Sequence, residues 1–198
     1  RGGLLPESQA GFRQKRSTQD QLIKLVQSCL RNSQLGLTTM ATFYDIEKAF
    51  DKMSHDGLVL KAKRLGLSNQ TVALLSNYLS NRTVQIKLEG LLSPPILLKA
   101  GTPQGAIISP SLFNIWVSDI PQPGNKKANL SQFADDIATW AAGRHVGAAR
   151  DKLQAYNDKV IKWCEEWNIL LAPSKTQVLT VSKKILENPH AAYQMVQG

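Results

Sequence analysis

The chain has 198 residues, 42% of them hydrophobic, and its 24 Lys and Arg residues against 15 Asp and Glu give a net charge of +9. This hydrophobic content supports a packed core and excludes wholesale disorder. The positive charge favours a polyanionic partner such as nucleic acid, with a basic surface that has no specific partner as the alternative. No apolar run is long enough to span a bilayer, so we expect no membrane partner.

The cysteines and histidines argue against a disulfide-rich protein and against a zinc-binding protein. The two cysteines, Cys29 and Cys164, lie within apolar helical patterns and have no CxxC spacing. This favours buried thiols in a reducing intracellular compartment over a disulfide framework. The three histidines are too scattered for a zinc site. Since the chain begins with Arg1 rather than Met, we expect it to be a fragment of a longer protein.

The first elements in chain order are a helix and a strand. Residues 17–20 have the pattern of a capping box, and the helix that follows is predicted to end near Asn32. Its apolar positions are Leu22, Leu25, Val26, Cys29 and Leu30. TTMATFYD, residues 38–45, is predicted to form a strand that places Phe43 and Asp45 on the same face.

Two helices and a hairpin are predicted next. Asp56 is expected to cap the first helix, which Gly66 closes, and Ser68 is expected to cap the second. TVQIKL, residues 83–88, alternates strictly between polar and apolar residues, which predicts a half-buried strand. A turn at Glu89–Gly90 is expected to lead back into PILLKA.

The remaining elements complete the pattern of an α+β fold. Ser109 is predicted to be the N-cap of a helix over SLFNIWVSDI, with Pro110 at its first position. NLSQFA and IATWAA are predicted strands of a hairpin, a long helix follows over 146–167, and ILLA and QVLTV are two more short strands. Helices and strands mix without regular βαβ alternation, which favours an antiparallel sheet with helices on one face.

Three aspartates occupy positions that suit a bound cation. Asp45 ends a predicted strand, and Asp135 and Asp136 lie at the tight turn of the predicted hairpin. Carboxylates that meet at one sheet edge repel each other and raise each other's pKa, and a divalent metal ion removes that penalty. Two such ions about 4 Å apart can activate an attacking hydroxyl and stabilise a leaving phosphate. The alternative is a solvated Asp-Asp turn and an unrelated aspartate at a strand end.

Two further positions favour nucleotide chemistry. Phe50 follows Asp45 closely, where a bulky ring can lie under a nucleotide sugar and exclude a 2′-hydroxyl; an ordinary core phenylalanine is the alternative. In GTPQGAIISP, glycines flank Pro103 and Gln104 ahead of a predicted helix, and glycine lets a backbone approach a flat ligand closely. Gln104 offers an amide to a sugar or base edge, whereas a simple Pro/Gly turn is the alternative.

Five sequence blocks, taken together and in order, resemble the reverse transcriptase family, specifically the enzymes of non-LTR (LINE-type) retrotransposons. The blocks are AGFRQKRSTQDQL, FYDIEKAFDKMSHDGLVLKAKRLGL, GTPQGAIISPSLFNIWVSDIP, QFADDIATW and NILLAPSKTQVL. They cover most of residues 9–181, and the ordered set is highly specific although each block alone is not.

The resemblance implies a right-hand polymerase, an α+β fold whose palm has an antiparallel sheet packed on helices. It implies partial fingers over 1–37, a palm over 38–182, and the start of a connection to a thumb over 183–198. The palm would include fingers-proximal helices and a hairpin around 66–103. The resemblance also implies that the first fingers strands and the thumb are absent from this chain.

The resemblance implies a role for each matched site residue. Asp45 and Asp135 match metal ligands, with Asp136 as the neighbouring carboxylate of the same metal site. This site would hold two Mg²⁺ ions, which Mn²⁺ can replace. Phe50 matches the family's sugar gate, and Gln104 matches its contact to the incoming nucleotide and template.

Three more matched residues would contact substrate. Arg13 matches a fingers arginine near the triphosphate, where a guanidinium suits phosphate oxygens. Lys175 matches a lysine that protonates the pyrophosphate leaving group, and an exposed turn lysine is the alternative. Phe133 stands at the primer end, where many relatives have tyrosine. For the basic residues of the 61–64 segment, a solvated helix face is the alternative to a phosphate contact. The further basic residues that we expect to contact phosphates are Lys15, Arg16, Lys61, Lys63, Arg64 and Arg82.

The resulting hypothesis is an RNA-directed DNA polymerase that transfers a deoxynucleotide to a primer 3′-hydroxyl. Its partners would be an RNA template, a DNA primer, deoxynucleoside triphosphates and the remainder of a larger retrotransposon polyprotein. One alternative is another two-metal phosphotransferase, such as a nuclease, against which Phe50 and the Gln104 loop argue. The other is a catalytically silent, truncated element copy that acts at most as an RNA-binding module.

Overall fold

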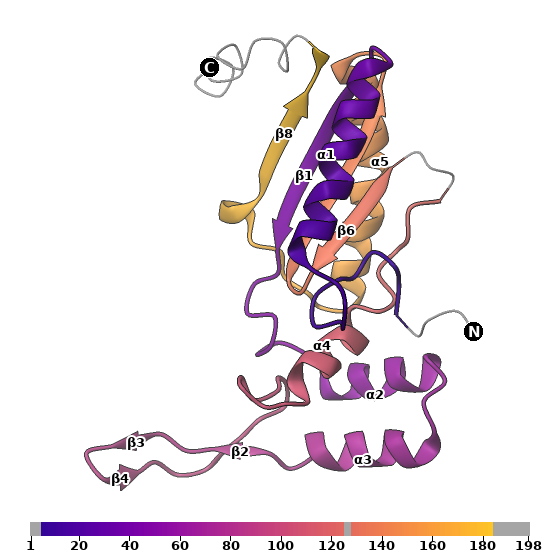
Figure 1. The fold of residues 1–198 in the computed structure, drawn as a ribbon. Coiled ribbons are helices and arrows are strands. Elements are labelled where there is room, and N and C mark those ends of the chain that lie inside the picture. The colour runs from indigo at the N-terminus through magenta and orange to yellow at the C-terminus, as the bar shows by residue number, and fades with distance from the viewer. Residues whose placement is uncertain (1–4, 125–127, 184–198) are drawn as a thin grey trace. The chain divides into compact units, whose positions relative to one another are not determined.

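The computed structural model describes residues 5–124 and 128–183 and contains two compact units. The sheet unit comprises Pro6–Glu47 and the described residues from Ile120 onward. The helical unit comprises Lys48–Asp119 together with Leu5. Figure 1 shows the elements of both units, and each unit is described by itself below.

The sheet unit is built on four antiparallel strands in the order β6-β7-β1-β8. The strands are β1 (Thr38–Asp45), β6 (Asn129–Phe133), β7 (Asp136–Gly143) and β8 (Gln177–Val181). The predicted antiparallel sheet is therefore confirmed. The pairing of β1 with β7 runs from Thr38 opposite Gly143 to Asp45 opposite Asp136, so the end of β1 meets the start of β7.

Helices cover both faces of this sheet rather than the one face expected. The two helices are α1 (Thr18–Gln34) and α5 (Val146–Glu166). Leu25 of α1 packs in one hydrophobic cluster with Ala41 of β1. Asn157 of α5 donates a hydrogen bond to Thr42, the next residue of the same strand. Because successive side chains of a strand point to opposite faces, α1 and α5 lie on opposite sides of the sheet (Figure 1).

Helix α1 begins with the predicted capping box. The Ser17 hydroxyl accepts a hydrogen bond from the Asp20 N–H at 3.2 Å, and the Asp20 carboxylate accepts one from the Ser17 N–H at 2.7 Å. The helix ends at Gln34, two residues beyond the predicted Asn32. Its buried stripe is Gln21, Leu25, Cys29 and Ser33, whereas Leu22, Val26 and Leu30 are exposed. The apolar pattern contained two adjacent stripes, and only one of them can face the sheet.

The helical unit contains three helices, two of which start at a different residue than predicted. They are α2 (His55–Arg64), α3 (Asn69–Leu79) and α4 (Ser109–Trp116). Ser54, not Asp56, caps α2, because its hydroxyl accepts the Gly57 N–H at 3.1 Å. Ser109 is not the N-cap of α4, since its hydroxyl donates to the Pro103 carbonyl at 2.7 Å. The predicted Ser68 cap of α3 is confirmed.

The segment after α3 forms an exposed hairpin instead of a half-buried strand. Its strands are β2 (Thr83–Val84), β3 (Lys87–Leu88), β4 (Leu91–Leu92) and β5 (Ile96–Leu97), all exposed. Between β2 and β3, the Ser93 hydroxyl accepts a hydrogen bond from the Ile86 N–H at 2.9 Å. The predicted turn is confirmed, with positive φ angles at Glu89 and Gly90.

The C-terminal part of the sheet unit follows the predictions with one exception. ILLA forms no strand and makes only an isolated bridge, between Ile46 and Leu171. It leads into a short 3₁₀ helix, η2 (Pro173–Lys175), which precedes β8. Both cysteines are buried, as predicted. Within the described residues, no helix has the length and apolar character needed to cross a bilayer. The predicted connection to a thumb, 183–198, lies outside them apart from Lys183.

Candidate active site

Two of the three predicted aspartates face each other at one end of the sheet, and the third lies next to them in the hairpin turn. Asp45, the last residue of β1, lies directly opposite Asp136, the first residue of β7. Such opposed residues place their Cβ atoms about 4.5–5.5 Å apart on the same face of a sheet. Asp135 precedes Asp136 in the hairpin turn, and its carbonyl accepts a hydrogen bond from the Ile46 N–H at 3.3 Å. The strand register therefore gathers carboxylates that are far apart in the sequence.

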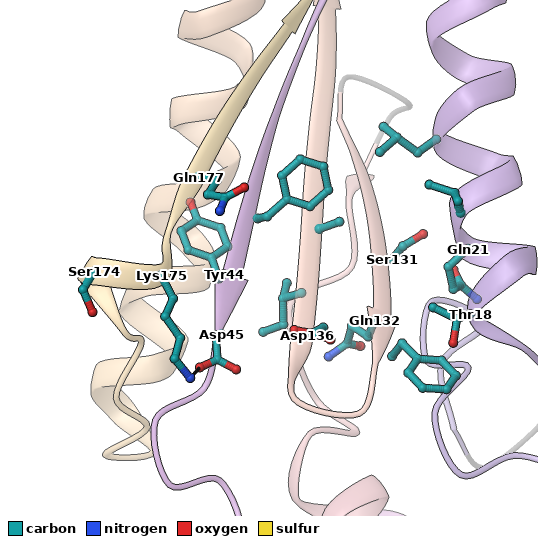
Figure 2. Close-up of a pocket in the computed structure, with 16 residues that line it drawn as sticks. Thr18, Gln21, Tyr44, Asp45, Ser131, Gln132, Asp136, Ser174, Lys175 and Gln177 are labelled. Atoms are coloured by element: carbon teal, nitrogen blue, oxygen red, sulfur yellow. Dashed lines mark hydrogen bonds and ion pairs between the residues drawn. The ribbon is translucent and has the colours of Figure 1, made fainter. Parts of the chain in front are cut away.

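The negative charges of these aspartates repel one another, and a nearby positive charge stabilises them. Partial burial, together with the negative charges of Asp135 and Asp45, raises the pKa of Asp136. Lys175 of η2 supplies one cation, with its Nζ 2.7 Å from Oδ2 of Asp45 (Figure 2). The hydrogen bond to Asp45 raises the pKa of Lys175 in turn. Asp45 thus already holds an ammonium group at the place where the carboxylates could hold a metal ion.

The donor set suits a hard divalent cation. Carboxylate oxygens are the protein ligands that Mg²⁺ prefers, with substrate phosphate oxygens and water completing its shell. In residues 5–124 and 128–183, however, no three Asp, Glu, His or Cys side chains converge closely enough to hold a metal ion by themselves. The metal site at Asp45, Asp135 and Asp136 therefore stays a prediction, with ligands from substrate as part of it.

A buried glutamine stabilises the turn that contains Asp135 by hydrogen bonding to its backbone. Gln9 is fully buried, and its Oε1 accepts hydrogen bonds from the Gly11 N–H at 2.7 Å and the Ala134 N–H at 3.3 Å. Ala134 has a positive φ of 55°, so the turn is conformationally demanding. A Cβ on Gly11 would lie 2.1 Å from the Ala134 nitrogen, which leaves room only for glycine. Sequence periodicity could not reveal this contact, because Gln9 lies outside any regular element.

A pocket of about 740 Å³ extends over the α1 side of the sheet from these carboxylates. Figure 2 shows its labelled residues, which come from α1, β1, β6, β7, η2 and β8. Phe133, opposite Asp136 in the register, is half-buried and lines this sheet-face pocket. Arg13 does not line it and instead donates to the carbonyls of Pro6 and Gln9 at 2.8 and 2.9 Å. The substrate roles of Phe133 and Arg13 stay predictions.

Phe50 and Gln104 belong to the helical unit and are described apart from the aspartates. The half-buried ring of Phe50 packs against Phe113, with a centroid distance of 5.3 Å. Gln104 is exposed, and its Nε2 donates to Oδ1 of Asp51 at 3.2 Å. The backbone of the same loop passes so close to Asp51 that a Cβ on Gly101 would lie 2.7 Å from the Asp51 carbonyl oxygen. Asp51 therefore lies against both Gly101 and Gln104 of this loop.

The position of Lys61 contradicts both interpretations drawn for it from the sequence. Its side chain is 1% exposed, so it is neither a phosphate contact nor part of a solvated face. Its Nζ donates to Oδ1 of Asp119 and to the carbonyl of Trp116, each at 2.6 Å. The ammonium also lies 4.7 Å from the Trp116 ring centroid. Lys61 is thus an internal link between α2 and the end of α4, because a buried ammonium needs such partners.

Comparison with known proteins identifies the family. Residues 3–190 match the family model described as "Reverse transcriptase (RNA-dependent DNA polymerase)". The "Probable RNA-directed DNA polymerase from transposon BS" of Drosophila melanogaster is 33% identical over 179 residues, which are 87% of this chain and 20% of the relative. The "RNA-directed DNA polymerase from mobile element jockey" of the same species is 30% identical, over 91% of this chain and 20% of the relative. The chain thus spans about one fifth of these relatives' length.

Solved structures support the fold. Apo telomerase from Candida tropicalis, truncated from its C-terminal domain, superposes with a TM-score of 0.67 at 15% identity, over 87% of this chain and 36% of that chain. Telomerase of the same species in complex with a fragment of telomeric RNA gives a TM-score of 0.68 at 12% identity, over 87% and 30%. At this identity the likeness shows the fold alone, an α+β polymerase palm with an antiparallel sheet. From the family match and these relatives, the chain belongs to the reverse transcriptases of non-LTR retrotransposons.

Proposed function

We propose that this chain is the catalytic core of an RNA-directed DNA polymerase, which adds deoxynucleotides to the 3′-hydroxyl of a primer. The observation that carries the proposal is the register that sets Asp45 opposite Asp136, with Asp135 beside them, in a chain of the reverse transcriptase family. The substrates are an RNA template, a DNA primer and deoxynucleoside triphosphates. A solved complex of a similarly folded telomerase with RNA supports an RNA partner.

The domain boundaries belong to the same proposal. Residues 38–182 form the palm, with fingers-proximal helices and the exposed hairpin around 66–103, and 1–37 contribute to the fingers. The chain acts within a larger retrotransposon polyprotein, as the length of its relatives supports.

The proposed site uses its aspartates to bind metal ions and its lysine to donate a proton. Asp45, Asp135 and Asp136 hold two Mg²⁺ ions, or Mn²⁺ in their place, together with substrate oxygens. When bound, such ions activate the primer hydroxyl and stabilise the charge on the leaving phosphate. Lys175, whose ammonium group lies beside Asp45, donates a proton to the pyrophosphate.

The remaining side chains position the substrates. Phe133 stacks at the primer end, and Arg13 binds triphosphate oxygens through its guanidinium. Gln104 contacts the incoming nucleotide and the template. Phe50 excludes the 2′-hydroxyl of a ribonucleotide.

Primer extension on an RNA template tests this function, with the full-length protein that contains the chain. We expect deoxynucleotide incorporation that stops when EDTA removes divalent ions and resumes when Mg²⁺ or Mn²⁺ is restored. Absence of extension under all these conditions would contradict the polymerase proposal. RNA binding without extension would instead support the second candidate, a silent RNA-binding module, which the net charge of +9 favours.

Replacement of Phe50 tests the sugar gate. Phe50→Ala is expected to raise ribonucleotide incorporation relative to deoxynucleotide incorporation by about 10²-fold, because the ring no longer excludes the 2′-hydroxyl. Steady-state incorporation of each matched nucleotide pair measures the ratio. Phe50→Tyr, which keeps the ring, is the control and should preserve the selectivity. An unchanged ratio in the alanine variant would remove Phe50 from this role and leave it a packing partner of Phe113.

A further inference from the structure

The end of the sheet-face pocket that lies against α1 has polar side chains with no assigned role. Gln21 of α1 and Ser131 of β6 both line the pocket, and Figure 2 shows them between the helix and the strand. Gln21 is 6% exposed and Ser131 is 4% exposed. Neither amide atom of Gln21 nor the hydroxyl of Ser131 has a hydrogen-bond partner among the described residues. Buried polar groups in native proteins almost always have partners, and a ligand in the pocket would supply the partners that these three atoms lack.

The walls around these polar atoms suit a flat ring with apolar faces. The pocket is lined by the aromatic rings of Phe43 and Phe133 and by the aliphatic side chains of Leu25 and Ala138. The glutamine amide presents one acceptor and one donor group side by side. Every nucleobase has two stackable faces and an edge on which a donor and an acceptor are adjacent. Proteins that read single strands use this combination of aromatic stacking and edge hydrogen bonds.

The rest of the pocket suits the backbone of a nucleic acid. At its other end lie Asp45, Asp136 and the Lys175 ammonium, whose side chain is 68% exposed and can reach a phosphate. A volume of about 740 Å³ exceeds what one base needs and leaves room for its sugar and phosphate. A strand passing the carboxylates could therefore place one base at Gln21 without leaving the pocket.

We propose that the sheet-face pocket binds one unstacked nucleobase of the nucleic-acid strand at the active site, through the Gln21 amide and the Ser131 hydroxyl. This inference rests on the proposed function, because it takes the strand beside Asp45 and Asp136 to be a polymerase substrate. Gln21 is a binding residue for the base and takes no part in the reaction. Since an amide can pair with the edge of any base, the site tolerates different sequences.

Two decameric strands with the same backbone charge test the proposal. One is decathymidylate, and the other is a decamer of abasic tetrahydrofuran phosphates. The dissociation constant of the abasic strand divided by that of decathymidylate therefore isolates the contribution of the bases. The protein is the full-length chain at constant salt concentration. Gln21→Met is expected to lower this ratio about tenfold, equivalent to about 1.4 kcal/mol. Ser131→Ala should lower it less, because it removes a single hydroxyl.

A matched control lies on the same helix. Gln27→Met makes the identical change at an exposed position outside the pocket and should leave the ratio unchanged. Gln21→Met should also raise the melting temperature of the protein without nucleic acid, because it removes a buried amide that has no partner. This combination, higher stability with weaker base-dependent binding, distinguishes a binding residue from a structural one.

The two proposals fail in different ways. An unchanged ratio in both Gln21→Met and Ser131→Ala would overturn the base site, even if primer extension is normal. Base-dependent binding that is lost in Gln21→Met, in a protein that cannot extend a primer, would support the base site and contradict the polymerase function.

Discussion

Asp45→Asn and Asp135→Asn are each expected to lower primer extension by about 10³-fold in the full-length protein. The carboxylates at this sheet edge are proposed to hold the divalent ions, and an amide oxygen carries no charge to attract them. Loss of about 4 kcal/mol of charge stabilisation in the transition state corresponds to this decrease. Single-nucleotide incorporation at saturating substrate, followed across a Mg²⁺ titration, measures both the rate and the ion requirement.

A matched control separates this effect from a general change in charge. Asp151→Asn removes one carboxylate from the exposed surface of α5, where Asp151 forms an ion pair with the neighbouring Arg150. It should retain wild-type extension, because an exposed pair of this kind contributes little. Asp45→Asn also weakens the contact to Lys175, which Asp135→Asn leaves in place. Equal rates for Asp135→Asn and wild type would refute the assignment of the hairpin carboxylates as metal ligands.

Asp119→Ala is expected to destabilise the helical unit by about 3 kcal/mol. Lys61 is almost completely buried and would keep its bond to the Trp116 carbonyl while losing its carboxylate partner. Removing the carboxylate costs this much because the Lys61 ammonium stays buried, although Asp119 itself is exposed. Amide hydrogen exchange in α2 and α4 of the full-length protein measures the loss as a lower opening free energy.

Asp56→Ala is the control for this second prediction. Asp56 is exposed in the first turn of α2, where it interacts with the helix dipole, and its replacement should cost less than about 1 kcal/mol. If exchange in α2 and α4 were equally fast in Asp119→Ala and wild type, the Lys61–Asp119 pair would contribute nothing to the stability of the unit.

Local signals in the sequence predicted most of the elements. Period-two alternation and short turns predicted β1, the β6–β7 hairpin and the tip of the exposed hairpin, because neighbouring residues decide these features. The capping box at Ser17 and the cap at Ser68 were likewise confirmed. The cap of α2 was assigned to Asp56 instead of Ser54, since both residue types cap helices and only the observed hydrogen bond distinguishes them.

Burial was harder to predict than secondary structure. The strand pattern at 83–88 predicted a buried face, yet the hairpin β2–β5 is exposed over all its strands in the structure. Lys61 shows the opposite error, since polar residues on helices are normally placed toward water. Gln21, for which no role was predicted, is buried as well. Gln21 did carry a signal, because it precedes Leu25 and Cys29 by four and eight positions on one stripe of α1.

The sequence by itself determined the order of the elements, the family and the candidate carboxylates, because these depend on residue types and short spacings. Only the tertiary structure decided that Asp45 faces Asp136, that Gln9 holds the Ala134 turn, and that Gln21 and Ser131 line one pocket. These contacts join residues about a hundred positions apart. Their geometry depends on strand register and on which helix stripe packs against the sheet, and no local pattern specifies either.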